Sequence, residues 1–288
     1  MKKFYTLKND LVFKNIFLKD YHKLKWLLEG IFEIIGLNID IKINNITNNE
    51  LYKERLYIKS KIVDSIINTN YAYINIELND TFNNTKKIRN FCYQTSYFNQ
   101  LVHINDDYAS IDKPVIQINL NTKTNENFIV NKYTITDNIT LEEYLKIFYI
   151  ININIDKILD KWYNKLNQDK NYFDKYKYIL ILGMNEQELK ELEVDDKMIK
   201  EIKDNVITLN KNPEFYQVMT REEDERRMRN TMFKEGEMLG IEEGKTLGIE
   251  EGKALTNIDN AKKMKKESCT LEFISKITGL DINTIKNL

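Results

Sequence analysis

The stretch KIVDSIINTNYAYINIELN, from Lys61 to Asn79, decides the fold of this chain. Two segments rich in β-branched and aromatic residues flank a turn-prone stretch at residues 68–70, and this pattern predicts a β-hairpin. The second segment alternates polar with apolar residues, which is the period of a half-buried strand. Its polar side consists of Tyr73, Asn75, Glu77 and Asn79. We therefore expect one face of this strand to pack and the other to carry Glu77 and Asn79.

Two carboxylates on this hairpin form a candidate metal site. If residues 69–70 make a two-residue loop, Asp64 lies opposite Asn75 and on the same face as Glu77. The diagonal Cα spacing would be roughly 7–8 Å, which lets both carboxylates reach one cation. A Mg²⁺ ion takes one or two acids and completes its octahedron with water and phosphate oxygens. The alternative is a pair of solvated acids on the outer face of the hairpin.

The composition indicates a globular protein and excludes several kinds of site. The chain has 288 residues, of which 42% are hydrophobic, and 43 basic residues balance 44 acidic ones. Any contact with nucleic acid therefore requires a local basic patch. Cys92 and Cys269 are too few for a disulfide framework or a zinc site, and His22 and His103 are too few for a His-rich centre. Without a signal-peptide core or a membrane-length apolar run, we expect a soluble cytoplasmic protein.

Hydrophobic periodicity predicts an α/β core in the first two thirds of the chain. The expected elements are a helix over 9–35 ending at Gly36, extended segments over 39–47 and 56–68, a strand over 71–79, a helix over 81–102, and strands over 113–121 and 127–137. The helix over 81–102 carries Ile88, Cys92, Thr95, Phe98 and Val102 along one side. Residues 139–209 read as mixed helical, with a short strand over 178–182.

The C-terminal part begins with a dense charged helix and an eight-residue repeat. The repeat reads GIEEGKTL over 240–247 and GIEEGKAL over 248–255, and glycine recurs every four residues from Gly236 to Gly252. Each glycine costs a helix about 1 kcal/mol relative to alanine. The glycines either admit a close partner helix or mark a weakly helical spacer, since a four-residue period drifts around a helix.

The last residues predict two short helices joined at Gly279 and Asp281, without a third helix beside them. They form either half of a DNA-reading helix-turn-helix or a small apolar cap or dimer patch.

Taken in order, these motifs resemble the recombination-promoting nuclease and putative transposase family of the PD-(D/E)XK nucleases. The matching segments are NDLVFKNIF over 9–17, the hairpin with Asp64 and Glu77, the helix and loop with Arg89, Tyr93, Gln100 and Tyr108, the strand PVIQINL over 114–120, and the C-terminal repeat and tail. The resemblance implies a restriction-endonuclease-like α/β core, a mixed sheet flanked by helices, over 1–210. A charged repeat helix over 211–256 and a small helical tail over 257–288 extend it.

The resemblance implies a Mg²⁺-dependent DNA endonuclease linked to recombination or mobile elements, with Mn²⁺ as a substitute ion. Asp64 and Glu77 would bind the metal with the backbone carbonyl of Leu78, and Asn79 would stand at the third catalytic position. The nuclease class has Lys there and this family often has Gln, whereas Asn is shorter than Gln and neutral. The alternative is a catalytically degenerate nuclease fold that binds DNA or acts as an oligomeric interaction protein.

Further residues have two interpretations each. Asp10 either adds a helix-borne acid to the metal site or caps its helix. Lys86, Lys87 and Arg89 either contact DNA phosphates or form a solvated helix start. The expected partners are DNA and a second copy of the chain bound through the Gly repeat, and no membrane. A purely structural oligomer built by the repeat is a third reading of the chain.

Overall fold

The computed structural model describes residues 3–47, 66–105, 111, 113–124, 126–166, 169–192 and 195–288. It divides the chain into two compact units, Met1–Asn212 and Pro213–Leu288. Asp64 and Tyr108 lie outside the described residues. None of the helices in the described part of the chain combines the length and the apolar surface needed to cross a bilayer.

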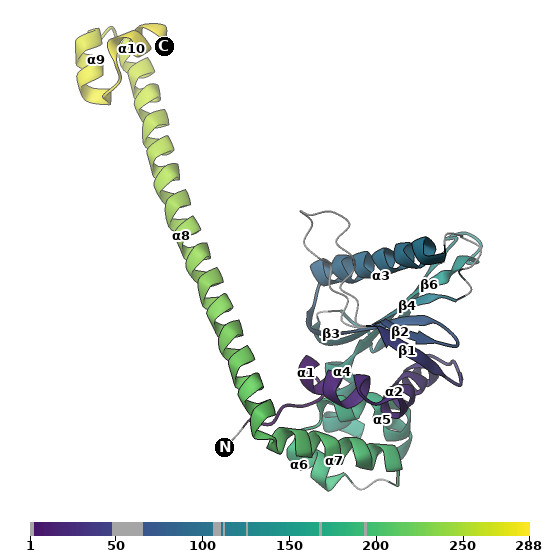
Figure 1. Cartoon of the computed structure of the whole chain (residues 1–288). Helices are drawn as coiled ribbons and strands as arrows, with labels where there is room; N and C mark the ends of the chain where they lie inside the picture. Colours follow the sequence, from purple (N-terminus) through teal and green to yellow (C-terminus); the bar gives the residue numbers. More distant parts are fainter. Residues whose placement is uncertain are drawn as a thin grey trace. The chain divides into compact units, whose positions relative to one another are not determined.

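A six-stranded mixed sheet forms the centre of the first unit, with helices on both faces (Figure 1). Its strand order is β1-β2-β3-β4-β6-β5, with the bounds β1 Ile43–Thr47, β2 Ile66–Thr69, β3 Tyr73–Phe82, β4 Val115–Thr124, β5 Val130–Thr136 and β6 Glu143–Asn154. Strands β3, β4 and β6 run parallel, and the remaining pairs are antiparallel. The carboxyl ends of three neighbouring strands therefore meet at one edge of the sheet.

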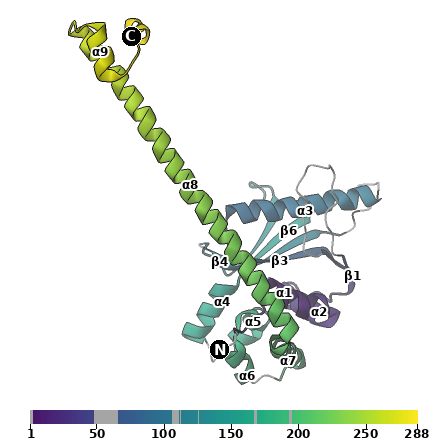
Figure 2. The same cartoon turned by 60° about the vertical axis from the view of Figure 1, so that its left-hand side comes forward.

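Helix α3 (Asn84–Asn105) covers one face of the sheet (Figure 1). The opposite face is covered by α1 (Asp10–Phe13), the π-helical turn Lys14–Leu18, α2 (Tyr21–Ile34), α4 (Ile155–Lys161) and α5 (Lys170–Gly183) (Figure 2). Beyond them lie a second π-helical turn, Trp162–Leu166, and helices α6 (Glu186–Glu191) and α7 (Lys197–Lys211). A Cβ on Gly30 of α2 would lie 2.1 Å from the Tyr178 ring of α5, so glycine allows these helices to approach closely.

Two predictions within residues 139–209 are wrong. Strand β6 occupies 143–154, where mixed helix was expected, and residues 178–182 lie in α5 rather than in a strand. Both segments contain continuous apolar runs, and the α5 residues Ile179–Leu182 are all buried. A run that is apolar on every side carries no helical or strand period, so the pattern alone does not separate the two structures.

Strand β3 is buried on both faces, whereas the alternation predicted a half-buried strand. The side chains of Ile76 and Leu78 meet α1 and the first π-helical turn, while Glu77 faces α3. Helix α3 in turn buries Asn90, Gln94, Tyr97 and Leu101 against the sheet. Ile88 of the same helix is 65% exposed. Buried polar groups on the sheet need polar partners, so the amides of α3 turn inward.

The hairpin register differs from the predicted one. Ile66 lies opposite Asn75 and Asn68 opposite Tyr73, and the Thr69 amide donates to the carbonyl of Ala72. The turn therefore lies at residues 70–71, one residue later than the predicted loop at 69–70, and Asn75 pairs with Ile66 rather than with Asp64. Because the shift is two residues, the face that carries Asn75 and Glu77 does not change.

The second unit joins the predicted segments 211–256 and 257–288 through one helix, α8 (Pro213–Lys266), of 54 residues. The short helices α9 (Leu271–Thr278) and α10 (Ile282–Asn287) confirm the predicted tail, with Gly279 at φ +72° and Asp281 as the cap of α10. Ala261, Ile274 and Ile285 form a small core between these helices and the end of α8. The tail therefore has a third helix, contrary to the prediction.

Candidate functional site

A layer of polar side chains fills much of the space between α3 and the sheet. We call it the polar layer and define it as Asn75, Glu77, Asn79, Arg89, Asn90, Gln117, Asn119, Asn121 and Asn152. All of these residues except Arg89 are buried. The layer runs along β3 and β4 from their third residues, Asn75 and Gln117, to their seventh, Asn79 and Asn121, and it lies against the first half of α3. Ligands of open α/β sheets bind at the carboxyl ends of the strands, and Asn79, Asn121 and Asn152 form the part of the layer nearest to those ends.

The buried amides satisfy one another in a chain of hydrogen bonds. Asn119 accepts from Asn90 Nδ2 (2.7 Å) and Gln117 Nε2 (3.0 Å) and donates to Asn152 Oδ1 (2.7 Å). Asn75 Nδ2 donates to Gln117 Oε1 at 2.9 Å. An amide side chain both donates and accepts, so such residues can follow one another across three strands and one helix without water. The chain of bonds holds α3 in one position over the sheet.

Arg89 joins the one carboxylate of the polar layer to the amides. Its Nη2 lies 3.2 Å from Glu77 Oε2 and 3.3 Å from Asn79 Oδ1, and Nε and Nη2 both donate to Asn90 Oδ1. The Glu77 side chain is 6% exposed, whereas the Arg89 side chain is 34% exposed. The guanidinium group also lies 5.5 Å from the centre of the Tyr93 ring. A buried carboxylate is thus paired with a cation that is open to solvent on one side.

Asn79 is held from two directions. Its Oδ1 accepts from Arg89, and its Nδ2 donates to Asn121 Oδ1 at 2.9 Å. Within the described part of the chain, Nδ2 of Asn121 and Oδ1 of Asn75 have no hydrogen-bond partner. Native structures leave few buried polar atoms unpaired. The polar layer therefore keeps one donor and one acceptor available for a water, an ion or a ligand group.

The opposite end of the interface between α3 and the sheet is apolar. Tyr97 and Leu101 of α3 pack there on Ile66 and Val115. Burial raises the pKa of the Tyr97 phenol, with a smaller contribution from Tyr73. The Tyr97 phenol is neutral, and a cation lies beside this end of the interface, since Lys113 Nζ is 5.5 Å from the centre of the Tyr73 ring.

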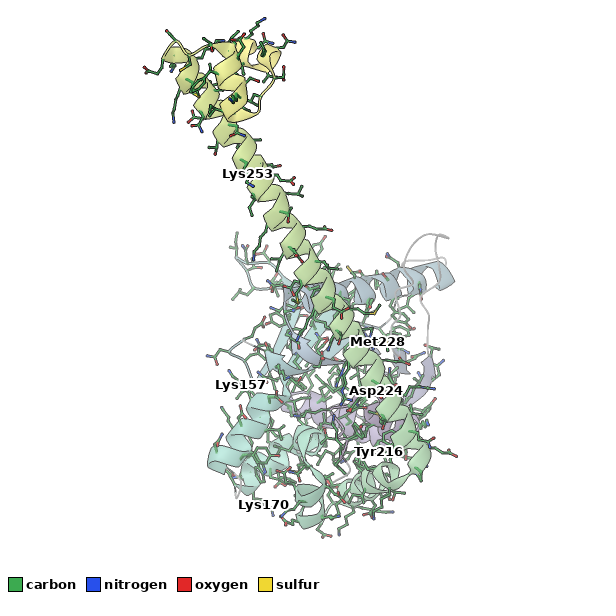
Figure 3. All side chains as sticks on the ribbon, turned by 90° about the vertical axis from the view of Figure 1, so that its left-hand side faces the viewer. Lys157, Lys170, Tyr216, Asp224, Met228 and Lys253 are labelled. Atoms are coloured by element: carbon green, nitrogen blue, oxygen red, sulfur yellow. The ribbon has the colours of Figure 1, made fainter. Side chains whose placement is uncertain are left out.

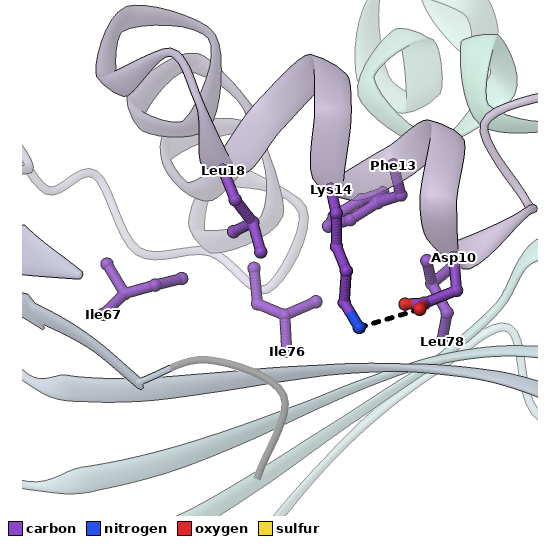
Figure 4. A pocket seen from close by; sticks show the side chains of 7 residues that line it. All are labelled: Asp10, Phe13, Lys14, Leu18, Ile67, Ile76 and Leu78. Carbon is purple, nitrogen blue, oxygen red and sulfur yellow. Dashed lines mark ion pairs between the residues drawn. The ribbon is translucent and has the colours of Figure 1, made fainter. Parts of the chain in front are cut away.

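Asp10 lies on the other face of the sheet from Glu77. Its carboxylate pairs with Lys14 at 2.7 Å, and both side chains line a cavity of about 10 Å³ together with Ile76 and Leu78 (Figure 4). This volume holds about one water molecule. Asn9, not Asp10, caps α1, because its side chain accepts from the Leu11 and Val12 amides. The predicted capping role of Asp10 is therefore wrong, and the sheet separates its carboxylate from Glu77.

The residues that were predicted to contact phosphate, Lys86, Lys87 and Arg89, lie at the start of α3, and in the structure they contact protein groups. Lys87 pairs with Glu126 and lies 5.7 Å from the centre of the Phe82 ring. The backbone amide of Lys86 donates to Asn83 Oδ1, and Arg89 contacts Glu77. Three basic residues therefore lie in the first two turns of α3, at the positive end of its dipole, where an anion is favoured.

The structure brings together some of the predicted site residues. Glu77, Asn79 and Arg89 meet in the polar layer, and Leu78 lies between the first two with its side chain on the other face. Gln100 lies farther along α3. Across the ranges that the structure describes, no three His, Cys, Asp or Glu side chains are grouped as in a metal site.

Sequence reasoning missed the amides of the polar layer. The sequence pattern that could have revealed these amides is Asn or Gln on one face of neighbouring strands. Such residues stand at 75 and 79, at 117, 119 and 121, and at 152. The general excess of Asn in the chain hid this signal.

Comparisons of the chain with protein-family models, with curated proteins and with solved structures find no significant match. Function is therefore inferred from the geometry of the polar layer.

Proposed function

We propose that this protein is a Mg²⁺-dependent DNA endonuclease whose active centre surrounds Glu77. The observation that carries the proposal is the buried Glu77 carboxylate in the middle of the parallel strand β3, beside a guanidinium group and amides. A buried ionic pair contributes little to stability compared with apolar packing, so a functional role is a better explanation of its presence. The element order α2, β1, β2, β3, α3, β4 also agrees with the core that the family resemblance implies.

The donor atoms near Glu77 fit a hard divalent cation. They are oxygens, namely the Glu77 carboxylate, Asn79 Oδ1 and the unpaired Asn75 Oδ1, and Mg²⁺ and Mn²⁺ prefer such ligands. We propose Asp64, outside the described residues, as the second carboxylate, and the Leu78 carbonyl as a further ligand. A bound Mg²⁺ would supply a Lewis acid and a water of lowered pKa.

The chain's own residues would orient the DNA. Lys86, Lys87 and Arg89 would attract the phosphodiester to the start of α3, where the helix dipole also favours an anion. Asn79 would hold a water or a phosphate oxygen through its amide. The link to recombination or mobile elements, and a cytoplasmic location, rest on the family resemblance alone.

Cleavage of supercoiled plasmid by the purified full-length protein tests this proposal. We expect nicked or linear product with Mg²⁺ or Mn²⁺, and loss of product in Glu77→Gln and in Asp64→Asn, because each change removes one carboxylate at nearly constant volume. Asp160→Asn is the matched control, since Asp160 is an exposed acid of α4. Cleavage that persists in both site variants would overturn the assignment of the active centre.

A catalytically inactive nuclease fold that binds DNA is the second candidate, and Asn79 favours it. Both polar ends of its amide are engaged, and it brings no positive charge to a phosphate in the transition state. This candidate predicts DNA binding in a gel-shift assay without metal-dependent cleavage. Binding should then weaken in Lys86→Gln and Lys87→Gln, which remove cations from the start of α3.

We also propose that the protein self-associates through α8. Large apolar side chains are exposed along this helix, namely Met228, Met232, Phe233, Met238, Leu239, Ile241, Leu247, Ile249 and Leu255. Figure 3 shows side chains along α8, including the labelled Met228 and Lys253. A Cβ added at Gly236, Gly240, Gly244, Gly248 or Gly252 would meet no atom within 4 Å. The apolar side chains are spread around α8 rather than gathered on one face. An isolated helix gains most of its stability from packing, so a second copy of α8 is the expected partner.

A further inference from the structure

Arg89 occupies the oxygens that the proposed metal would need. One nitrogen, Nη2, lies within 3.3 Å of both Glu77 Oε2 and Asn79 Oδ1. A Mg²⁺ ion binds its oxygen ligands at about 2.0–2.1 Å. An ion on Glu77 Oε2 and a guanidinium on the same oxygen would be two cations only a few ångströms apart, and they would repel each other strongly in a buried site.

The same cation is needed when no metal is bound. Glu77 is nearly fully buried, and an uncompensated charge there would destabilise the fold. Arg89 provides the compensation from α3, and its bonds to Asn90 Oδ1 hold the guanidinium close to the strand. The fold therefore does not depend on a metal ion to neutralise Glu77.

The Arg89 side chain can also move away from Glu77. A third of its side chain is exposed, and it lies at the start of α3 near Lys86 and Lys87. Its guanidinium already lies within cation–π distance of the Tyr93 ring while it pairs with Glu77, so this contact does not depend on the carboxylate alone. A planar guanidinium that leaves a carboxylate is well suited to bind a phosphate through two hydrogen bonds.

We propose that Arg89 is a built-in counter-ion that competes with the divalent metal for Glu77 and moves to the DNA phosphate when the metal binds. This inference rests on the metal site of the proposed function. It makes Arg89 a residue that couples metal binding to phosphate binding. The affinity for metal alone is then reduced by the fraction of molecules in which Arg89 holds Glu77.

Metal titration in the absence of DNA tests the competition. Mn²⁺ binding to the full-length protein would be followed by electron paramagnetic resonance and calorimetry. We expect Arg89→Gln to bind Mn²⁺ about tenfold more tightly than the wild type, because the competing cation is gone. Lys86→Gln is the matched control, since it removes the same charge one turn away, and it should change the affinity less than about twofold. Equal or weaker binding by Arg89→Gln, or an equal gain in Lys86→Gln, would overturn the proposal.

Two further variants keep the test decisive. Arg89→Lys retains the positive charge, so it controls for misfolding caused by an unpaired Glu77. It should bind Mn²⁺ about threefold more tightly than the wild type, since an ammonium group cannot make the paired hydrogen bonds of the planar guanidinium. Glu77→Gln/Arg89→Gln should lose the gain of Arg89→Gln. Metal binding by the double variant as tight as that of Arg89→Gln would show that Glu77 is not the ligand and would overturn the inference.

The plasmid assay separates this inference from the proposed function. If Mn²⁺ binds more tightly to Arg89→Gln but no variant or wild type cleaves DNA, the endonuclease proposal fails and the competition stands. If the wild type cleaves, Glu77→Gln does not, and Arg89→Gln binds Mn²⁺ like the wild type, the competition fails and the endonuclease proposal stands. Failure of every variant to bind Mn²⁺ would overturn the competition as well.

Discussion

Arg89 of α3 and Glu77 of β3 form an ion pair, with Nη2 3.2 Å from Oε2, in which the acid is buried and the base is one-third exposed. The pair joins the middle of β3 to the second turn of α3, among amides that hydrogen-bond the helix to β4 and β4 to β6. The orientation of the proposed catalytic acid is therefore linked to the position of α3. Any change to Arg89 is expected to affect stability and ligand binding together.

Removing the cation of this pair should destabilise the protein. We expect Arg89→Gln to lower the free energy of unfolding by about 3 kcal/mol in EDTA, at the low end for breaking a buried pair, because Arg89 is partly exposed. Glu77→Gln/Arg89→Gln should recover part of this loss, since no buried charge remains. Urea denaturation of the two single variants and the double variant measures the coupling between the residues. If the stability losses of the two single variants add up to that of the double variant, the Glu77–Arg89 pair is not a source of stability.

Lysine at position 79 should not restore the pattern of the nuclease class in this chain. Asn79 is buried and in contact with Arg89, so Asn79→Lys places two cations in contact beside a single acid. We expect a loss of at least about 2 kcal/mol in the free energy of unfolding, from a buried charge without a partner of its own. Asn79→Lys/Arg89→Gln should be more stable than Asn79→Lys alone, because the lysine can then pair with Glu77. Equal stability of these two variants in urea denaturation would count against the repulsion.

The sequence predicted the order of elements around Glu77 better than their environment. Strand β3 and helix α3 were expected from alternation and from a helical period, and both are present. The cover over Glu77 was not expected, because the pattern of one strand does not reveal what packs on its polar side. That cover depends on amides of α3, β4 and β6, which come together only in the folded chain. Strand β6 was missed because its apolar run has no period.

Asn119 should be a sensitive position of the polar layer. It exchanges hydrogen bonds with Asn90, Gln117 and Asn152, so Asn119→Leu leaves three buried polar groups without a partner. We expect a loss of roughly 3 kcal/mol or more in the free energy of unfolding. Asn44→Leu is the matched control, an exposed strand Asn bonded only to Asn68 among the described residues, and it should change stability by less than about 0.5 kcal/mol. Urea denaturation of both variants makes the comparison, and similar losses would contradict the role assigned to Asn119.

Acid should remove one contact that holds α5 to α7. Asp196 caps α7 and pairs with Lys177 of α5 at 2.9 Å. Burial alone would raise the pKa of Asp196, but the Lys177 ammonium and the α7 amides outweigh it, and the pKa lies below 3.8. A carboxyl whose pKa is lowered on folding stabilises the protein fully above its unfolded pKa and loses this effect as the pH falls through the folded pKa.

Asp196→Asn keeps the cap and removes the charge, so it isolates the ion pair. We expect the variant to be less stable than the wild type by about 1 kcal/mol at pH 7, with the difference shrinking below pH 3.8. Thermal denaturation from pH 7 to pH 3 measures it. Asp195→Asn is the control, because Asp195 is fully exposed, and it should show no such pH dependence. A difference that stays constant from pH 7 to pH 3 would rule out the ion pair as its source.

The glycines of α8 should distinguish a helical interface from a spacer. In an isolated helix Gly244→Ala and Gly248→Ala would each add up to about 1 kcal/mol of helix stability, because a Cβ at these positions meets no other atom. Leucine at the same positions is also a good helix former, but it would hold a close partner helix away. We therefore expect Gly244→Leu/Gly248→Leu to weaken self-association at least tenfold in sedimentation velocity while raising helix content by circular dichroism.

Glu243→Leu is the control for added apolar surface, since it lies on α8 beside the glycines and is exposed. Two results would show that the glycines do not form the interface. In the first, the double leucine variant associates as tightly as the wild type. In the second, it associates more tightly than the wild type and to the same degree as Glu243→Leu. Deletion of residues 236–255 should leave a monomer, because it removes both repeats. A dimer that survives this deletion would assign self-association to another surface of the chain.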